Sequence, residues 1–446
     1  MSRVETLSGW GRWPKRDCVV DDFDPATDTP DRFNHSTITR GAGRSYGDAA
    51  MNPDMTFLGP LRNRFISFDP EAGDLVLQAG AKLSEVLEAF VPRGWFLPVT
   101  PGTKFATIAG VLAVDAHGKN HHAEGSFGDH VNWFDLMQAD GQIKRCSPKD
   151  SVHLFNATIG GMGLTGHILT VSIKLRRIET AWIQQKTLPA ANLEQAMQLF
   201  EDHQDATYSV AWLDCLAKGD ARGRSLIYLG EHASVAQLPA EQRSKPFDYP
   251  APKPKSMPID APNWALNRFS LKAFNYLYYR KGTKAPPVEL VDYDRYFYPL
   301  DAIHQWNRLY GKRGFAQYQC ALPLASAKEA LLEQLDAISK AGLGSFLAVL
   351  KRLGPGAPNR PLSFPIEGYT LALDFPLTPQ ALTLMDLLDE ITIAHGGRLY
   401  LAKDSRMTQA TFEASYGDAL TQFRALRRQT GAYDAFQSLQ SRRLNL

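Results

Sequence analysis

Residues 40–48 read RGAGRSYGD and hold three glycines and a serine directly after a short β-like run. Such a loop exposes successive backbone N–H groups, which bind a pyrophosphate without help from charged side chains. A dinucleotide is therefore the natural ligand. The spacing does not match GxGxxG and no helix is predicted after it, so a Rossmann fold is not indicated. Taken alone, the loop fits a glycine-rich hairpin turn equally well.

A second glycine-rich segment, residues 101–128, has mostly small side chains between positions 107 and 118. Small residues let the backbone lie flat against a planar ring system. Four of the eleven histidines fall in or beside this segment, namely His117, His121, His122 and His130. A metal site is the alternative, but there is no HExxH helix and no cysteine nearby. A catalytic or packing role for these histidines is the preferred interpretation.

A third segment, ATIGGMGLTG at residues 157–166, turns tightly into a β-like run that begins at His167. Ten of the 34 glycines lie within residues 102–166 of this 446-residue chain, which marks a place where the backbone approaches another group closely. A hairpin with positive φ would explain one such segment. Three segments in one stretch favour a cofactor site.

Together with YLAKDSR near the C-terminus, these segments resemble the FAD-dependent oxidases that have a vanillyl-alcohol-oxidase (PCMH-type) flavin domain. Within that superfamily the chain is similar to the family of decaprenylphosphoryl-β-D-ribose 2-oxidases. The motifs HGKNHH, GSFG and AKDSR are more specific than any glycine loop, and the likeness runs over essentially the whole chain.

The resemblance implies an α+β fold in three parts. Residues 1–180 form a PCMH-type FAD-binding domain, residues 181–397 an inserted substrate-binding domain of antiparallel sheet flanked by helices, and residues 398–446 a C-terminal segment that completes the FAD domain. FAD is expected to lie between the two domains. Covalent members of the superfamily place a histidine where Arg44 stands, so non-covalent FAD is expected.

The resemblance also implies which residues bind FAD, mostly through their backbone. They are Thr39, Arg40, Gly41, Ala42, Gly43, Arg44, Ser45, Tyr46, Gly47, Asp48, Ala49, Gly102, Thr107, Ile108, Ala109, Gly110, Val114, Asp115, Ala116, His117, Ile168 and Tyr400.

Oxidation of a secondary alcohol needs a hydride acceptor at the carbinol carbon and a group that removes or stabilises the hydroxyl proton. From the resemblance, Lys403 of AKDSR is the first candidate for this group. A desolvated lysine can lose its proton near neutral pH, or polarise an alkoxide while charged. His117 is the second candidate, as a base or as a group that orients the ring. Without the resemblance, an ion pair between Lys403 and Asp404 or a surface charge would be the simpler explanation.

Residues 315–321 and 345–351 have the pattern of strands that the resemblance directs toward the flavin. Alternation places Gln317 and Gln319 on one face and Tyr318 on the other. Gln319 and Lys351 are the preferred substrate contacts, and Tyr318 joins them only if a bulge intervenes. Relatives commonly have a cysteine where Ala372 stands. The resemblance therefore does not imply that thiol-directed inhibitors act on this chain.

The elements that must hold these residues are short strands with one amphipathic helix from Ser84 in residues 1–180. Beyond Ile178, helices are predicted near 192–204, 327–340 and 378–395, with strands at 208–213, 225–229, 315–321, 345–351 and 369–375. Thr378 is the expected N-cap of the last helix, with Pro379 in its first turn. Residues 246–262 hold six prolines, which exclude a helix or a central strand.

Composition sets outer limits on the function. A chain of 446 residues with 44% hydrophobic and 22% charged residues predicts two or three folded domains rather than disorder. A net charge of +2 does not indicate a nucleic-acid binder. The four cysteines form no CxxC motif, which argues against a disulfide framework or a zinc site. No signal peptide and no apolar run long enough to span a membrane are visible.

The resulting hypothesis is an FAD-dependent oxidoreductase of cell-envelope arabinose biosynthesis. It oxidises the ribose 2-hydroxyl of a polyprenylphosphoryl-β-D-ribose to the 2-keto compound, and a separate NAD(P)H-dependent ketoreductase completes the epimerisation. An alditol or sugar-lactone oxidase that uses oxygen is one alternative, and a flavin- or lipid-binding module without turnover is another. The protein is expected in the cytoplasm, with peripheral contact to the inner membrane through residues 272–284, which mix aromatic and basic side chains. The same stretch fits a segment packed on its own domain.

Overall fold

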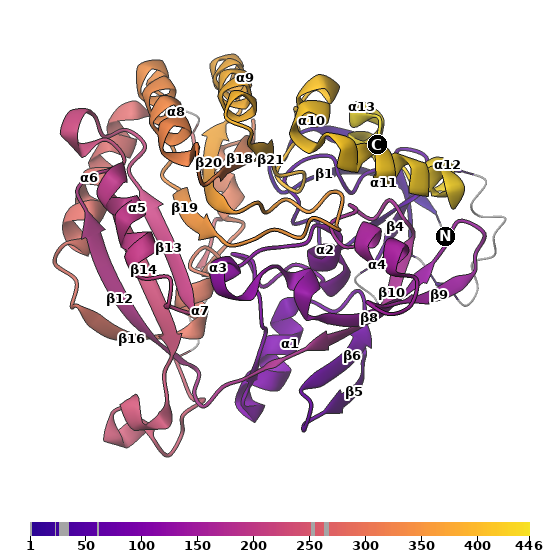
Figure 1. The fold of residues 1–446 in the computed structure, drawn as a ribbon, viewed down its shortest axis with the longest axis horizontal. Coiled ribbons are helices and arrows are strands. Elements are labelled where there is room, and N and C mark those ends of the chain that lie inside the picture. Colours follow the sequence, from indigo (N-terminus) through magenta and orange to yellow (C-terminus); the bar gives the residue numbers. More distant parts are fainter. Residues whose placement is uncertain (1, 23, 26–34, 60–61, 251–254, 263–266) are drawn as a thin grey trace.

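The computed structural model describes residues 2–22, 24–25, 35–59, 62–250, 255–262 and 267–446. Within these residues three larger sheets form the frame of the protein (Figure 1). The first has the strand order β1-β2-β4-β3, the second β5-β6-β10-β8-β9, and the third, of eight strands, β16-β12-β14-β13-β19-β20-β18-β21. The first two sheets contain β1 (Arg3–Ser8), β2 (Lys15–Asp22), β3 (Ile38–Arg40), β4 (Thr56–Leu58), β5 (Phe65–Asp69), β6 (Asp74–Gln78), β8 (Val131–Met137), β9 (Ile143–Cys146) and β10 (His167–Lys174).

The eight-stranded sheet is built from residues beyond position 181. Its strands are β12 (Trp182–Ala190), β13 (Tyr208–Leu213), β14 (Ser225–His232), β16 (Val288–Asp292), β18 (Phe315–Pro323), β19 (Ala348–Leu353), β20 (Gly368–Pro376) and β21 (Arg398–Leu399). Two short pairs join β7 (Trp95–Phe96) to β11 (Arg176–Arg177) and β15 (Lys255–Ser256) to β17 (Ile303–His304).

Helices cover these sheets. They are α1 (Leu83–Phe90), α2 (Ile108–Ala113), α3 (His121–Glu124), α4 (Val152–Thr158), α5 (Leu193–Asp202), α6 (Arg268–Gly282), α7 (Tyr293–Phe297), α8 (Ala327–Ala341), α9 (Pro379–Ala394), α10 (Gln409–Tyr416), α11 (Asp418–Gln429), α12 (Ala432–Ala435) and α13 (Leu439–Leu444).

The neighbouring strands of the eight-stranded sheet pair antiparallel throughout, and α5, α8 and α9 pack on it. The predicted antiparallel sheet flanked by helices is therefore confirmed. Its register matters for the site, because Gln317 pairs with Asp374 and Gln319 pairs with Ala372 across β18 and β20. Side chains opposite each other on an antiparallel pair share one face of the sheet.

Two of the helices form where local sequence patterns predict them. Thr378 caps α9 by accepting a hydrogen bond from Ala381 N–H at 3.1 Å, and Pro379 occupies the first position, as predicted. In α1 the apolar residues recur at helical spacing and are buried, so this helix lies against the core beside the second sheet.

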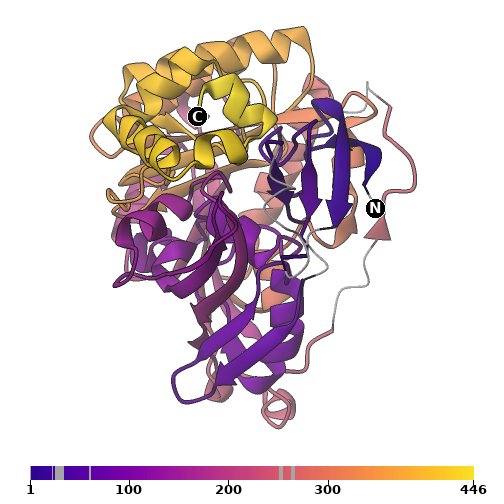
Figure 2. The same cartoon turned by 90° about the vertical axis from the view of Figure 1, so that its right-hand side faces the viewer.

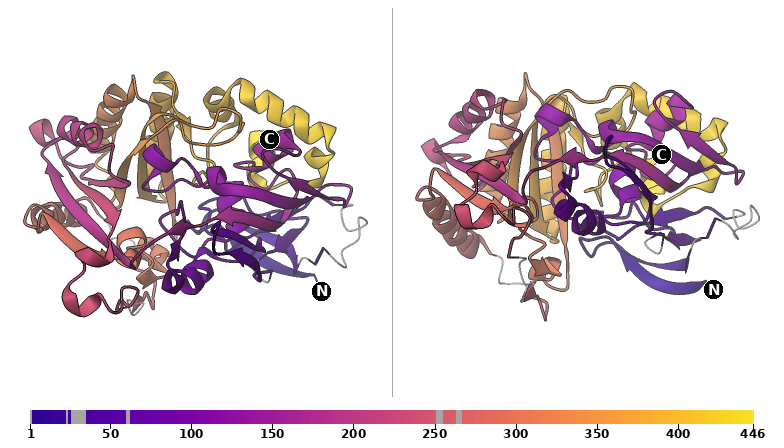
Figure 3. Two further views of the ribbon diagram at one scale, coloured as in Figure 1. Left: turned by 60° about the horizontal axis from the view of Figure 1, so that its bottom comes forward. Right: turned by 90° about the horizontal axis from the view of Figure 1, so that it is seen from below.

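The C-terminal helices return to the N-terminal part of the chain. Figure 2 shows α10–α13, in yellow, beside the N-terminal strands, and Figure 3 shows the eight-stranded sheet standing next to both. Thr37 N–H donates to Ala435 O at 2.7 Å, and Arg443 pairs with Asp48 at 2.8 Å. Residues at opposite ends of the sequence thus build one packed unit.

The proline-rich stretch and the basic aromatic stretch both lie between β14 and β16 in the sequence. The described part of residues 246–262 contains neither an α-helix nor a central strand, as predicted, and residues 251–254 lie outside the described residues. Most of residues 272–284 belongs to α6, which packs over β12 and β14.

Candidate active site

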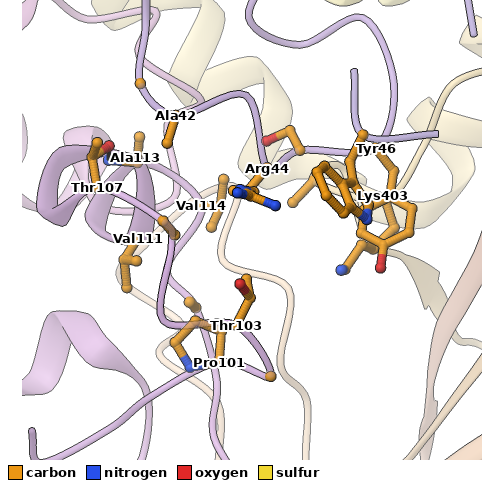
Figure 4. A pocket seen from close by; sticks show the side chains of 18 of the residues that line it. Ala42, Arg44, Tyr46, Pro101, Thr103, Thr107, Val111, Ala113, Val114 and Lys403 are labelled. Carbon is orange, nitrogen blue, oxygen red and sulfur yellow. Dashed lines mark hydrogen bonds between the residues drawn. The ribbon is translucent and has the colours of Figure 1, made fainter. Parts of the chain in front are cut away.

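A cavity of about 450 Å³ lies between the N-terminal part of the chain and the eight-stranded sheet. Its wall contains all three glycine-rich segments, strands β13, β18, β19 and β20, and the turn at residues 400–403. Figure 4 shows the loop with Ala42 and Arg44, the start of α2 at Thr107, and Lys403 beside Tyr46 facing the same space. The motifs singled out in the sequence therefore converge on one site.

The loop at residues 40–48 presents backbone donors to this cavity. Within the described residues, the N–H groups of residues 41–45 have no acceptor. The loop packs closely on α2, because a Cβ at Gly41 would overlap Oγ1 of Thr107, the N-cap of that helix. A run of free N–H groups binds phosphate oxygens, so the loop fits the pyrophosphate of FAD.

Most residues predicted to bind FAD line the cavity, but three do not. Asp48, Ile108 and Asp115 lie behind its wall. Asp48 pairs with Arg443, Ile108 belongs to the core, and Asp115 accepts hydrogen bonds from Ser363 Oγ at 2.6 Å and Gly128 N–H at 3.0 Å. The cavity lining thus does not include these three predicted residues, whose contacts hold the loops that form the wall.

An aromatic group closes one side of the cavity. Tyr400 stacks on Phe364 at 4.4 Å between ring centroids, and its hydroxyl donates to Val114 O at 3.1 Å. His117 lies 5.4 Å from the Tyr400 ring. Planar groups held in this way provide a surface against which a flat ring system can lie.

His117 is neutral in this environment. The Gln319 side-chain amide donates to His117 Nε2 at 3.1 Å, which assigns the proton of the imidazole to Nδ1. Burial lowers the pKa of His117 well below its usual value, and the charges of Lys351, His121 and Lys403 lower it further. His117 is thus suited to orienting a neighbouring group rather than to carrying a positive charge.

Lys403 is held on the turn after Tyr400, where its N–H donates to Tyr400 O at 2.9 Å. Its ammonium group lies 3.8 Å from the centroid of the Tyr46 ring. Burial lowers the pKa of Lys403 to about 8, and the carboxylate of Asp374 opposes this shift. The simpler explanation, an ion pair with Asp404, is not what the structure shows, because Asp404 pairs with Arg443 at 2.8 Å.

Asp374 is a buried carboxyl within electrostatic range of Lys403 that sequence reasoning missed. Burial raises the pKa of Asp374 to about 7, whereas a hydrogen bond from the Gln317 amide and the charge of Lys403 lower it. The charges of these two buried groups therefore act on each other across the interior of the protein. Only the pairing of β18 with β20 brings these residues together, and no local motif signals it.

The strand β18 alternates as predicted. Gln317 and Gln319 line the cavity, whereas Tyr318 points to the opposite face and donates to Leu388 O at 2.7 Å. The expectation that Tyr318 contacts substrate is therefore corrected, because no bulge interrupts the pairing of β18 with β20. Lys351 on β19 lines the cavity, and so does Ala372.

Other residues of the cavity wall were not predicted. They are aromatic or basic side chains, chiefly Trp10, Lys119, Trp212, Tyr228 and Tyr278. Tyr228 Oη donates to Tyr278 Oη at 3.0 Å, and Tyr278 belongs to α6. Lys119 could have been noticed, since it lies within HGKNHH, but the aromatic residues carry no local signal.

Comparison with known proteins identifies the family of this chain. A model described as "FAD binding domain" matches residues 26–147. The chain is 37% identical over 456 residues to decaprenylphosphoryl-β-D-ribose oxidase of Mycolicibacterium smegmatis, covering 99% of this chain and 98% of the relative. The chain belongs to the decaprenylphosphoryl-β-D-ribose oxidase family. Proteins of this family have the PCMH-type fold and are FAD-dependent oxidoreductases. FAD is therefore the cofactor of this chain.

Other relatives of this oxidase family match over different lengths. An uncharacterised protein of Streptomyces coelicolor is 34% identical over 376 residues, which cover 82% of this chain and all of the relative. Mouse L-gulonolactone oxidase is 28% identical over 137 residues, or 30% of each chain. The likeness to the lactone oxidases is therefore limited to a part of the chain.

Proposed function

We propose that this oxidoreductase oxidises the ribose 2-hydroxyl of a polyprenylphosphoryl-β-D-ribose to the ketone, as the first half of an epimerisation to the arabinose. The observation that carries the proposal is the position of Lys403, a buried lysine, at the cavity that the FAD-binding loops line. The name of the Mycolicibacterium smegmatis relative, which matches over the full chain, supports the same substrate class.

The cofactor and the residues of the cavity have different parts in the proposed reaction. Bound FAD supplies the hydride acceptor for the carbinol carbon. Lys403, neutral above a pKa of about 8, takes the proton of the 2-hydroxyl. Gln319 orients His117, and the stack of Tyr400 on Phe364 excludes water from that side.

Anaerobic mixing with candidate substrates tests the proposal. A polyprenylphosphoryl-β-D-ribose analogue should bleach the flavin, whereas xylitol and L-gulono-1,4-lactone should not. Bleaching by the alditol or the lactone alone would instead identify an oxidase of those substrates. A flavin that no substrate reduces would identify a binding module without turnover.

The proposed product needs a second enzyme. A 2-keto sugar becomes the arabinose only when hydride is added to the opposite face, so we assign that step to a separate NAD(P)H-dependent ketoreductase. A cytoplasmic location follows from that supply of reduced nicotinamide. We also propose the three-part division into residues 1–180, 181–397 and 398–446, which agrees with the return of α10–α13 to the N-terminal strands.

FAD is expected to be bound without a covalent link. The four cysteines are buried and do not line the cavity. Arg44, at the position where covalent members have histidine, lies 4.2 Å over the Trp10 ring. The purified protein should be yellow, and acid precipitation should release the whole flavin into the supernatant. Yellow colour that stays in the pellet would contradict this prediction.

A peripheral membrane contact is expected at α6. Among the described residues, no helix has both the length and the apolar character to cross a bilayer. Instead, α6 exposes Phe269 and Leu277 to 83% and 65%, and Arg280, Lys281 and Lys284 follow at its C-terminal end. Apolar side chains beside a basic cluster fit an anionic lipid surface, where each basic residue contributes roughly 1 kcal/mol at low salt.

Replacing Arg280, Lys281 and Lys284 by glutamine should therefore weaken binding to phosphatidylglycerol vesicles by at least tenfold, and added salt should weaken the parent. Cosedimentation measures both effects. The matched control changes Lys144 of β9, Lys149 before α4 and Lys174 of β10, which are exposed, to glutamine. Figure 1 shows β9, α4 and β10 on the other side of the molecule from α6. Equal loss of binding in both triple variants would show that α6 is not the contact.

A further inference from the structure

The cavity holds more positive charge than its own carboxylates balance. Lys119, Lys351 and Lys403 all line it. The charge of Asp374 acts on Lys403, but within the described residues neither Lys119 nor Lys351 forms an ion pair with a carboxylate. Enclosed ammonium groups without a counter-charge are costly, which indicates that the ligand of the site supplies an anion.

Lys119 and Lys351 come from different elements but act on the same space. Lys119 belongs to the second glycine-rich segment, donates to Tyr296 O and lies 4.0 Å from the centroid of the Tyr296 ring on α7. Lys351 lies on β19, and no hydrogen-bond partner of its ammonium group is found in the described part of the chain. Lys119 is held beside Tyr296, whereas the ammonium group of Lys351 has no partner among the described residues. Both ammonium groups can therefore donate to a third group between them.

We propose that Lys119 and Lys351 form an anion subsite that binds the phosphodiester of the lipid-linked sugar. The inference rests on the proposed function and adds to it the group that selects a phosphorylated substrate. The anomeric carbon that carries the phosphate is bonded directly to C2. A ribose with its 2-hydroxyl at Lys403 therefore places its phosphate within a few ångströms of that hydroxyl, in the cavity that Lys119 and Lys351 also line.

The electrostatics of the cavity agree with this placement. Burial together with the charge of Lys351 lowers the pKa of Lys119 to about 7, and burial together with the charge of Lys403 lowers that of Lys351 to about 7. The charge of Lys351 also lowers the pKa of His117 and of His121. Lys351 thus lies within electrostatic range of Lys119, Lys403 and both histidines, and a bound anion would raise the pKa of each lysine.

The remaining wall continues from the lysines toward an apolar exit. Trp212, Tyr228 and Tyr278 line the cavity, and Tyr278 stacks on Phe274 of α6 at 5.6 Å between centroids. A polyprenyl chain that leaves the phosphate along these rings would reach the exposed face of α6. The cavity wall thus offers a group for each part of the substrate: Lys403 for the sugar, the lysine pair for the phosphate and the aromatic side chains for the lipid.

Two unreactive ligands test the subsite. Farnesylphosphoryl-2-deoxy-β-D-ribose and farnesyl 2-deoxy-β-D-riboside share sugar and lipid but differ in the phosphate, and neither has a 2-hydroxyl to oxidise. Their Kd values are measured on the FAD-loaded protein by quenching of tryptophan fluorescence. In Lys351→Met and Lys119→Met, the Kd of the phosphorylated ligand should rise about 10- to 100-fold, as for a lost charged hydrogen bond. The Kd of the riboside should change less than twofold.

Controls separate charge from packing. Lys312→Met removes an exposed lysine of the same part of the chain and should change neither Kd. In the parent, the Kd of the phosphorylated ligand should rise above pH 7, because the lysines lose their protons there while the phosphodiester stays anionic. Lys351→Arg should keep tight binding at high pH, because arginine remains charged.

Several results would overturn the subsite. They are equal effects of the methionine variants on both ligands, no effect on either, or a parent that binds the riboside as tightly as the phosphorylated ligand. Reduction of the parent flavin by farnesylphosphoryl-β-D-ribose is measured separately. If that reduction occurs and the lysine variants do not discriminate, only the subsite fails; if no reduction occurs, the proposed function itself fails.

Discussion

Lys403→Ala is expected to slow reduction of the flavin by substrate about 100-fold or more, while the protein keeps its FAD and its thermal stability. The loss follows from removing the group that takes the hydroxyl proton, which contributes on the order of 10² to 10⁴ in rate. Little structural cost is expected, because the ammonium group contacts the Tyr46 ring and has no tight ion pair with Asp404. Anaerobic stopped-flow bleaching with a polyprenylphosphoryl-ribose analogue measures the rate.

Two further variants make this experiment specific. Lys403→Arg should also fail, because arginine stays charged and cannot act as a base. His117→Ala should instead disturb both flavin binding and rate, because His117 lies beside Tyr400 and accepts from Gln319. With burial lowering the pKa of Lys403 to about 8, the parent rate should rise with pH up to that value. Lys403→Ala at the parent rate would show that the proton goes elsewhere.

Local patterns in the sequence predicted a good part of this site. The glycine-rich segments line the cavity because small residues and free N–H groups serve a cofactor wherever the chain carries them. Strand alternation sorted Gln317 and Gln319 from Tyr318, and the threonine–proline signal located the start of α9. Each of these features depends on residues a few positions apart.

The unpredicted features depend on partners far apart in the sequence. Asp374 meets Lys403 only because β20 pairs with β18 and the C-terminal segment returns to the same sheet. Asp404, the adjacent candidate for an ion pair, is instead engaged by Arg443 of α13. Adjacency in the sequence therefore did not predict which charged side chains form ion pairs, since tertiary packing decides which charges lie close together.

Gly47→Ala is expected to abolish the retention of FAD. A Cβ at this position would overlap the carbonyl oxygen of Asp404 and lie 2.7 Å from Ser405 Cα. Neither backbone can easily yield, because Tyr46 N–H donates to Ala402 O at 3.0 Å and Arg443 holds the Asp404 carboxylate at 2.8 Å. The loop would have to move away from the turn that carries Lys403, and its N–H groups would lose their position for the pyrophosphate.

The ratio of flavin absorbance to protein absorbance measures this loss directly, and thermal unfolding with and without excess FAD shows whether the apoprotein still folds. Gly219→Ala is the matched control. Its φ of +59° strains a side chain, a cost that Gly47→Ala does not carry, but a Cβ there meets no atom within 4 Å, so full FAD content is expected in this variant. Full FAD content in Gly47→Ala would mean that the loop and the C-terminal turn can separate freely. The contact between these distant segments would then not be what fixes the cofactor against Lys403.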